Sequence, residues 1–254
     1  MKPPIKNYSS DGDNQSSKQE KHIFDKALDQ TFKNWHMYII DDHSTDNSWS
    51  IIKKFSNLNN VTQIRLSKNM GPSFCRNYAM RISKSKYISF IDSDDSWLSD
   101  KLEKQIIFME RHNLSFTYTD YTPFFESFGK KKIRKRTFLK DHFNYRTFLK
   151  NSSINTTTMI IARSILGSHR FRKVQLLEDY LFKCKLLKDN NIAKKLDENL
   201  AFYRILNKSR SSQRLKNIYW LWNINKNYNK LNFLQNVISI FFISINSVKK
   251  YGIK

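Results

Sequence analysis

The stretch KYISFIDSDDSW, residues 86–97, places three carboxylates directly after an apolar strand. The run from Tyr87 to Ile91 is apolar nearly throughout, as is typical of a strand whose two faces are both covered in a parallel sheet. Asp92, Asp94 and Asp95 follow within four positions, where like charges repel unless a cation binds among them. The alternative explanation is that Asp92 and Asp95 cap a turn and the next helix.

Strands and helices alternate on both sides of this stretch. The patterns predict strands at 37–40, 61–68 and 115–121 and helices at 21–32, 47–55, 71–83, 100–112 and 178–188. Such alternation is typical of an α/β domain with a largely parallel sheet. The basic run at 130–140 is expected to be a surface loop or an exposed strand.

Composition limits the class of partner. The 254 residues include 45 Lys and Arg against 22 Asp and Glu, a net charge of +23, which favours nucleic acid, an anionic membrane face or phosphorylated small molecules. A lysine-rich surface that is simply solvated is the alternative. Cys75 and Cys184 fit no metal-binding or redox motif, and no apolar run is long enough to span a membrane, so a cytoplasmic protein is expected.

A second acidic pair follows another strand. Asp41 and Asp42 end the strand expected at 37–40, as the three acids end the strand at 87–91. Ligands of open α/β sheets bind beyond the carboxyl ends of the strands. In a D-x-D arrangement, one carboxylate can bind Mg²⁺ or Mn²⁺ while another holds a hydroxyl group of the ligand.

The ordered motifs resemble family 2 glycosyltransferases of the GT-A fold, in particular bacterial enzymes that build capsule, O-antigen and teichuronic-type polysaccharides. The segments that carry the resemblance are QTFKNWHMYIIDDHSTDNS (30–48), KNMGPSFCRNYAM (68–80), KYISFIDSDDSWLSDKLEKQIIFM (86–109), YTDY (118–121), LLEDYLFKCKLLKD (176–189) and LAFYRILNKSRSS (200–212). The resemblance implies a Rossmann-like, mostly parallel sheet flanked by helices over residues 21–212.

The resemblance also implies a nucleotide-diphosphate sugar donor and a divalent metal, Mn²⁺ or Mg²⁺. Asp42 resembles the acid that pairs with the nucleotide base, and Asp41 its more structural neighbour. Asp92 resembles the first acid of the DxD motif, near the ribose and the metal, and Asp94 the acid that coordinates the metal. The remaining residues that the resemblance places at the nucleotide sugar are Arg76, Asp95 and Arg204. A solvated helix arginine is the alternative for Arg76.

The second half of the chain is expected to supply the catalytic base. Glu178 and Asp179 resemble the family's ED motif, in which the Asp takes a proton from the acceptor hydroxyl during an inverting displacement. Acids in the first turn of a helix are also expected from the helix dipole alone. Arg204 resembles the late Tyr-Arg segment, although Leu206 stands where the family usually has His, which leaves the role of this segment open.

The start of the chain departs from the family pattern. Family members open with an apolar strand, whereas MKPPIKNYSSDGDNQSSKQE (1–20) holds no apolar run of four residues. The first strand of the sheet is therefore expected to be missing or degenerate, within a disordered or altered lead-in over 1–20. Three explanations stay open: a divergent active enzyme with lowered donor affinity, a truncated product, or a weakly active or inactive homologue that acts as a binding partner.

The tail at 213–254 is expected to be an amphipathic helical extension. Leu234, Val237, Phe241, Ile245 and Val248 recur at helical spacing, and lysines flank them. Peripheral contact with the cytoplasmic membrane face and packing on the domain or a partner subunit are the two alternatives.

The leading hypothesis is a sugar transferase that acts on a glycan or lipid-linked acceptor in bacterial surface polysaccharide biosynthesis. A basic nucleic-acid-binding protein is the rival, but no nucleic-acid-binding motif accompanies the charge, so no nucleic-acid partner is expected.

Overall fold

The computed structural model describes residues 5–8, 27–127, 130–205 and 214–251. Its strands are β1 (Ile5–Tyr8), β2 (Met37–Asp41), β3 (Val61–Arg65), β4 (Tyr87–Asp92), β5 (Ser96–Trp97), β6 (Phe116–Ser127), β7 (Lys130–Ile133), β8 (His142–Phe143), β9 (Ile160–Ala162) and β10 (Ala193–Arg204). Its helices are α2 (Ser48–Lys53), α3 (Pro72–Ile82), α4 (Lys101–Arg111), α5 (Tyr145–Phe148), α6 (Glu178–Lys188), α7 (Arg214–Asn227) and α8 (Phe233–Tyr251), with 3₁₀ turns η1 (Thr156–Thr158) and η2 (Arg163–Ile165).

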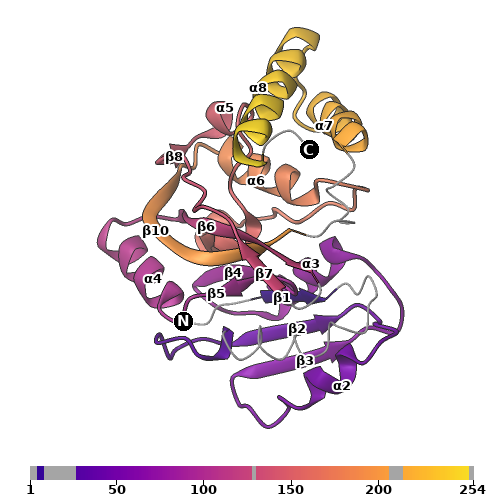
Figure 1. The fold of residues 1–254 in the computed structure, drawn as a ribbon, viewed down its shortest axis with the longest axis vertical. Helices are drawn as coiled ribbons and strands as arrows, with labels where there is room; N and C mark the ends of the chain where they lie inside the picture. Colours follow the sequence, from indigo (N-terminus) through magenta and orange to yellow (C-terminus); the bar gives the residue numbers. More distant parts are fainter. Residues whose placement is uncertain (1–4, 9–26, 128–129, 206–213, 252–254) are drawn as a thin grey trace.

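The strands of the described residues form one ten-stranded sheet, which helices flank (Figure 1). Its order is β3-β2-β1-β4-β9-β6-β10-β5, with β7 beside β6 and β8 beside β10. Parallel pairs join β3, β2, β1 and β4, and also β6 and β10. Because β9 is antiparallel to both β4 and β6, these two strands point the same way. The predicted α/β class with a largely parallel sheet is therefore confirmed.

The first strand was predicted to be missing or degenerate; it is present as a short, largely polar strand, so the prediction that it is missing is wrong. Residues 5–8 form β1, which lies between β2 and β4 and pairs with both in parallel. A four-residue strand needs no apolar run to join a sheet, since its backbone N–H and C=O groups are satisfied by two neighbouring strands. Residues 1–4 and 9–20 of the expected lead-in, and most of the helix expected at 21–32, lie outside the described residues.

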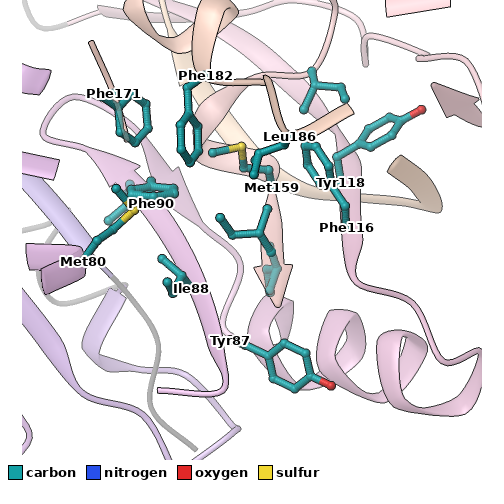
Figure 2. Packing of buried hydrophobic residues seen from close by; sticks show 14 of the residues in the cluster. Met80, Tyr87, Ile88, Phe90, Phe116, Tyr118, Met159, Phe171, Phe182 and Leu186 are labelled. Carbon is teal, nitrogen blue, oxygen red and sulfur yellow. The ribbon is translucent and has the colours of Figure 1, made fainter. Parts of the chain in front are cut away.

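Strand β4 lies at the centre of the hydrophobic core (Figure 2). Five of its six residues are buried, because helices and the second half of the chain cover its faces. Phe90 meets the ring of Phe171 edge-on at 5.4 Å, and Phe171 stacks on Phe182 of α6 at 4.0 Å. These contacts attach α6 to β4, so the elements that carry the two predicted halves of the site share one core.

Strand β10 was not predicted from the sequence, although it has twelve residues. Its pairing with β6 shifts register between Leu196 and Asn199 and again between Asn199 and Ala201. Each irregularity interrupts the alternation of buried and exposed side chains that identifies a strand in a sequence. Polar residues therefore occur throughout β10 at positions where a regular strand would repeat apolar ones.

The C-terminal helix α8 packs on the protein through the apolar side chains of Ile240 and Ile243 and through a set of polar side chains. Asn236 and Ser239 are 1% and 2% exposed, and both accept hydrogen bonds from the side-chain amide of Asn225 in α7, at 3.1 and 3.0 Å. Ser239 also donates to the carbonyl of Leu149. We call these contacts of Asn225, Asn236 and Ser239 the polar seam.

The outward side of α8 is apolar. Side chains that are 41–74% exposed form what we call the apolar stripe: Phe233, Leu234, Val237, Phe241, Phe242 and Val248. The helix expected from the sequence thus exists, and the side that faces the protein carries both polar residues (Asn236, Ser239) and apolar ones (Ile240, Ile243). Over the described residues, no helix is both long enough and apolar enough to cross a membrane.

Lys101, at the start of α4, is fully buried. Its Nζ donates to Gln105 at 2.9 Å and lies 4.4 Å from the ring centroid of Trp97, with no carboxylate partner among the described ion pairs. Burial lowers the pKa of this lysine from 10.5 to about 7. The unfolded chain therefore binds one more proton than the fold between pH 7 and 10.5, and stability rises with pH across this window.

Lys101→Met is expected to stabilise the protein by a few kcal/mol at pH 6, because each unit of pKa shift corresponds to about 1.4 kcal/mol. The gain should shrink as pH rises from 7 and vanish near pH 10.5, where the lysine is neutral in both states. Urea unfolding of both proteins at pH 6, 8 and 10 measures it. A difference that is constant with pH would contradict the assignment.

Candidate active site

The acidic residues predicted from the sequence gather at one edge of the sheet. Register places Asp41, at the end of β2, beside Tyr8 of β1, and Asp92, at the end of β4, beside Asn7. Both acids thus flank the end of the same central strand. This is the carboxyl edge of the parallel strands, where ligands of open α/β sheets bind.

Asp41 is engaged within the protein. It is fully buried, and its Oδ1 accepts hydrogen bonds from the backbone N–H (3.2 Å) and the hydroxyl of Ser44. Its Oδ2 lies 3.2 Å from Nε of Arg65 on β3. These contacts fix the turn after β2, as the structural role expected for Asp41 requires.

Asp42 accepts hydrogen bonds from the loop that precedes α3. Its two carboxylate oxygens accept from the backbone N–H groups of Met70 (2.6 Å) and Gly71 (2.8 Å). Gly71 has φ +84°, which favours glycine, and His43 has φ +60° in the turn after Asp42. Asp42 therefore holds the 70–71 loop against the end of β2.

Arg76 of α3 connects the two halves of the site. Its Nη2 donates to Asp92 at 2.8 Å, its Nη1 donates to Glu178 of α6 at 3.2 Å, and its guanidinium lies 5.2 Å from the ring centroid of Phe171. Burial acts to lower the pKa of Arg76, but Asp92, Glu178 and Asp179 outweigh it and raise the pKa. The side chain is 7% exposed, so Arg76 is a buried cation between two carboxylates rather than a solvated helix arginine.

The turn from β4 to β5 holds the D-x-D-D acids together with Arg204. The carboxylate of Asp95 accepts the backbone N–H of Arg204 at 3.0 Å, and Nε of Arg204 donates to the carbonyl of Asp94 at 3.2 Å. Asp95 is fully buried, and burial followed by the charges of Asp94 and Asp92 raises its pKa well above the usual range. Its Oδ2 has no hydrogen-bond partner within the described structure. The turn thus concentrates negative charge that a cation would relieve.

A divalent ion fits this turn only if other oxygens complete its coordination. Among the residues with described positions, no three Asp, Glu, His or Cys side chains are arranged to hold a metal by themselves. Mg²⁺ characteristically takes one or two carboxylates and keeps its other positions for water and substrate phosphates. The side chain of Asp92 is 32% exposed, and Asp94 is also only partly buried. Asp92 and Asp94 therefore provide the two accessible carboxylates that such an ion requires as protein ligands.

Asp179 lies at the start of α6 beside a buried lysine. Its Oδ2 accepts from Nζ of Lys183 at 2.7 Å and from the hydroxyl of Thr156 at 3.2 Å, and 35% of its side chain stays exposed. Withdrawal from water acts to raise its pKa, but Lys183 dominates and lowers the pKa to about 2. The carboxylate is therefore ionised at neutral pH. Leu177, with φ +63°, fixes the approach to this helix.

The sequence analysis did not identify the supporting residues. Thr157 in η1 accepts from the backbone N–H of Asp92 at 3.4 Å, and its carbonyl accepts from Nε1 of Trp97 at 2.8 Å. Lys183 holds Asp179 in place and also donates to the carbonyl of Ile154 at 2.7 Å. The run TTT after Asn155, and a Lys four residues after Asp179, were the available signals.

The thiol of Cys75, next to Arg76, is buried at the end of the site. Burial, with a further contribution from Asp42, raises its pKa to about 12. A thiol with so high a pKa is not a nucleophile at neutral pH. Cys75 is therefore a packing residue.

A parallel sheet with acids at its carboxyl edge, connected through an arginine to a second acidic pair, is similar to the GT-A fold of solved structures, and this likeness is one of fold alone. S. aureus TarS, solved in complex with UDP-GlcNAc, superposes with a TM-score of 0.73 at 18% identity, over 98% of this chain and 73% of that one.

The sequence comparisons give the family. Residues 21–180 match the model of glycosyl transferase family 2, and the chain belongs to this family. The putative teichuronic acid biosynthesis glycosyltransferase TuaG of Bacillus subtilis is 30% identical over 88% of both chains. The UDP-Glc:α-D-GlcNAc-diphosphoundecaprenol β-1,3-glucosyltransferase WfgD of Escherichia coli is 33% identical over 78% of this chain and 76% of its own. The chain is thus a glycosyltransferase.

Proposed function

We propose that this glycosyltransferase moves a sugar from a nucleotide-diphosphate sugar to a glycan or lipid-linked acceptor during bacterial surface polysaccharide biosynthesis, with inversion at the anomeric carbon. The bridge from Arg76 to both Asp92 and Glu178 is the observation that carries the proposal. It joins the acids expected at the donor to the acids expected at the acceptor. The functions that TuaG and WfgD are named for support the choice of pathway.

On the donor side, Asp42 is assigned to the nucleotide base and Asp41 to the support of its turn. Asp95 and Arg204 are assigned to positions beside the ribose and the diphosphate. Arg76 is assigned to supply positive charge near the phosphates. In the proposed division of the chain, the catalytic domain comprises β1 together with residues 21–212, and 213–254 is an extension.

Asp92 and Asp94 are assigned to hold a divalent metal, Mn²⁺ or Mg²⁺. Such an ion, when bound, neutralises the charge that develops on the departing diphosphate. The partly exposed carboxylates and the unpartnered Oδ2 of Asp95 support this assignment.

Asp179 is assigned as the base. It accepts the proton of the acceptor hydroxyl while the hydroxyl oxygen forms a bond to the anomeric carbon, and the bond from that carbon to the nucleoside diphosphate breaks. Thr156 and Lys183 hold the carboxylate in one orientation. Glu178 faces Arg76, so its assigned role is to position that arginine rather than to touch the acceptor.

A metal-dependence assay tests the donor assignment. Nucleotide release from UDP-glucose and UDP-GlcNAc is measured once with Mn²⁺ and once with EDTA. The proteins compared are the wild type, Asp94→Asn and the control Asp29→Asn, since the side chain of Asp29 is exposed on the surface. Wild type and control should turn over donor only with metal, and Asp94→Asn should lose roughly a hundredfold because the ion is worth several kcal/mol. Equal turnover in EDTA would overturn the metal assignment, and no turnover of any sugar donor would overturn the function.

We further propose that α8 binds the cytoplasmic face of an anionic membrane. The apolar stripe is exposed, and Lys226, Lys230, Lys249 and Lys250 flank the helix. An amphipathic helix with basic residues beside an exposed apolar face is the chemistry that binds such an interface.

Replacing Leu234 and Phe241 by Ser should weaken binding to vesicles of phosphatidylglycerol and phosphatidylcholine by at least about tenfold, since each large apolar side chain contributes about 1.5–3 kcal/mol on burial. Leu58→Ser with Ile107→Ser is the control, because these side chains are also exposed but lie far from α8 in the chain. Co-sedimentation measures both. If the α8 variant sediments like wild type, membrane contact through this helix is excluded.

A further inference from the structure

A basic cleft lies between the segment after β7 and the end of α8. Its volume is about 580 Å³, within the range of about 300–1,000 Å³ that small-molecule sites occupy. Among the described residues, six cationic side chains and no carboxylate line it: Arg134, Lys135, Arg136, Lys140, Lys249 and Lys250. We call it the basic cleft.

Part of this positive charge has no carboxylate partner among the residues that the structure describes. Arg136 is paired, with Asp120 at 2.7 Å and with Asp197 at 2.8 Å. For Lys135, Lys140 and Lys249, the part of the chain that the structure describes offers no carboxylate within ion-pair distance. Clustered cations of this kind destabilise the protein unless an anion binds among them.

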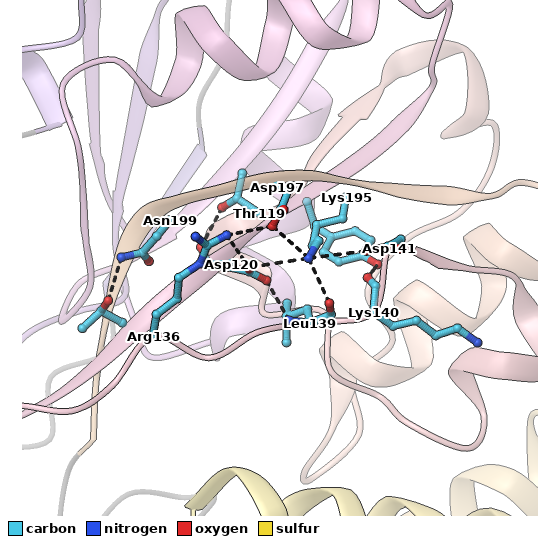
Figure 3. Close-up of polar contacts among 11 residues, drawn as sticks. Thr119, Asp120, Arg136, Leu139, Lys140, Asp141, Lys195, Asp197 and Asn199 are labelled. Carbon is cyan, nitrogen blue, oxygen red and sulfur yellow. Dashed lines mark hydrogen bonds and ion pairs between the residues drawn. The ribbon is translucent and has the colours of Figure 1, made fainter.

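A buried network fixes the wall of the basic cleft (Figure 3). Asp120 of β6 is fully buried, and its carboxylate accepts from Nε and Nη2 of Arg136 and from the backbone N–H of Leu139 at 2.8 Å. Lys195 of β10 reaches the same carboxylate at 3.6 Å. The segment that presents Lys135 and Lys140 is therefore held in place before any ligand arrives.

The basic cleft adjoins the residues that support Asp179. Lys250 donates to the hydroxyl of Ser153, and the next residue, Ile154, accepts from Lys183, which holds Asp179. Burial, with the charge of Lys183, lowers the pKa of Lys250 to about 7, and an anion in the basic cleft would favour its charged form. A ligand bound here would thus lie on the acceptor side of the site.

The apolar stripe of α8 ends beside the basic cleft. Phe242 is exposed midway along α8 and Val248 is exposed near its end, next to Lys249 and Lys250 of the basic cleft. A cationic hollow at the end of an apolar surface matches an amphiphile with a phosphorylated head and a hydrocarbon tail. A free nucleotide has no hydrocarbon tail to cover such a surface.

We propose that the basic cleft binds the diphosphate of a lipid-linked acceptor, with the lipid chain along the apolar stripe. This inference rests on the proposed function, because it names the acceptor class of that same site. Held in this way, the diphosphate would orient the acceptor sugar toward Asp179.

Binding of farnesyl diphosphate, a short isoprenyl diphosphate, to the full chain tests the inference. Calorimetric titration in EDTA and without sugar donor keeps the proposed metal site out of the measurement. The wild type should bind farnesyl diphosphate, bind inorganic diphosphate more weakly and bind farnesol much more weakly. Lys135→Gln, Lys140→Gln and Lys249→Gln together should weaken binding by about tenfold or more, because charge-assisted contacts are lost.

The matched control is Lys54→Gln, Lys84→Gln and Lys173→Gln, which removes three exposed charges elsewhere and should bind like wild type. Equal weakening in both triple variants, displacement by UDP, or farnesol binding as tightly as its diphosphate would each overturn the inference. Inorganic diphosphate binding as tightly as farnesyl diphosphate would also overturn it, since the lipid chain would then contribute nothing. The donor-turnover assay is separate, so its failure would refute the proposed function without deciding this titration.

Discussion

Asp179→Asn is expected to lower kcat for sugar transfer by about 10²–10⁴-fold, the usual contribution of a positioned general base. The amide keeps the shape of the carboxylate and its oxygen can still accept from Thr156 and Lys183, which limits structural disturbance. What the variant loses is the capacity to accept the proton of the attacking hydroxyl. Release of nucleoside diphosphate, measured with acceptor at saturation, reports the loss.

Asp189→Asn is the matched control for this prediction. It makes the same substitution at the other end of α6, where Asp189 is exposed and contacts His169. Its kcat should equal that of the wild type, and both variants should bind UDP as the wild type does. An Asp179→Asn enzyme with unchanged kcat would remove Asp179 from the mechanism.

Arg76→Met is expected to destabilise the fold by about 3–5 kcal/mol, the cost of removing one partner from a buried ion pair. The substitution leaves the carboxylates of Asp92 and Glu178 facing each other without the cation that both now contact. Methionine fills a similar volume, so the loss comes mainly from charge rather than from a cavity. Urea unfolding at pH 7 measures it.

Arg81→Met provides the comparison, because Arg81 lies in the same helix with an exposed side chain. Its unfolding free energy should stay within about 0.5 kcal/mol of wild type, as for most surface substitutions. If Arg76→Met is no more destabilising than Arg81→Met, the buried bridge does not hold the two halves of the site together.

The fold was predictable wherever local pattern and tertiary environment agree. Strands β2 and β4 and helix α6 follow from apolar runs and helical periodicity, and α6 begins and ends at the expected residues. Strand β1 was missed because its stability comes from pairing with β2 and β4, which the tetrapeptide itself does not encode. Strand β10 was missed because its register shifts break the period that a single sequence reveals.

The candidate site was predictable as a set of acids but not as a network. The positions of Asp42, Asp92 and Asp179 each follow from a short motif of neighbouring residues. The partners that hold them come from elsewhere: Arg76 reaches Glu178 across 102 positions, and Asp95 meets Arg204 across 109. Such contacts depend on how the strands are ordered in the sheet, which no local spacing determines.

Because of the polar seam beneath α8, the contacts that attach this helix to the protein differ from those that its apolar stripe can make with lipid. Hydrogen bonds of Asn225, Asn236 and Ser239, together with the packing of Ile240 and Ile243, attach the helix to the protein, so most of its apolar stripe takes no part in that attachment. If the helix were attached to the protein through the side chains of its apolar stripe, it would have to detach before lipid could contact them. In the proposed membrane contact, α8 can therefore bind a bilayer without detaching from the protein. The carboxyl edge of the sheet would then stay at a fixed distance from the lipid head groups.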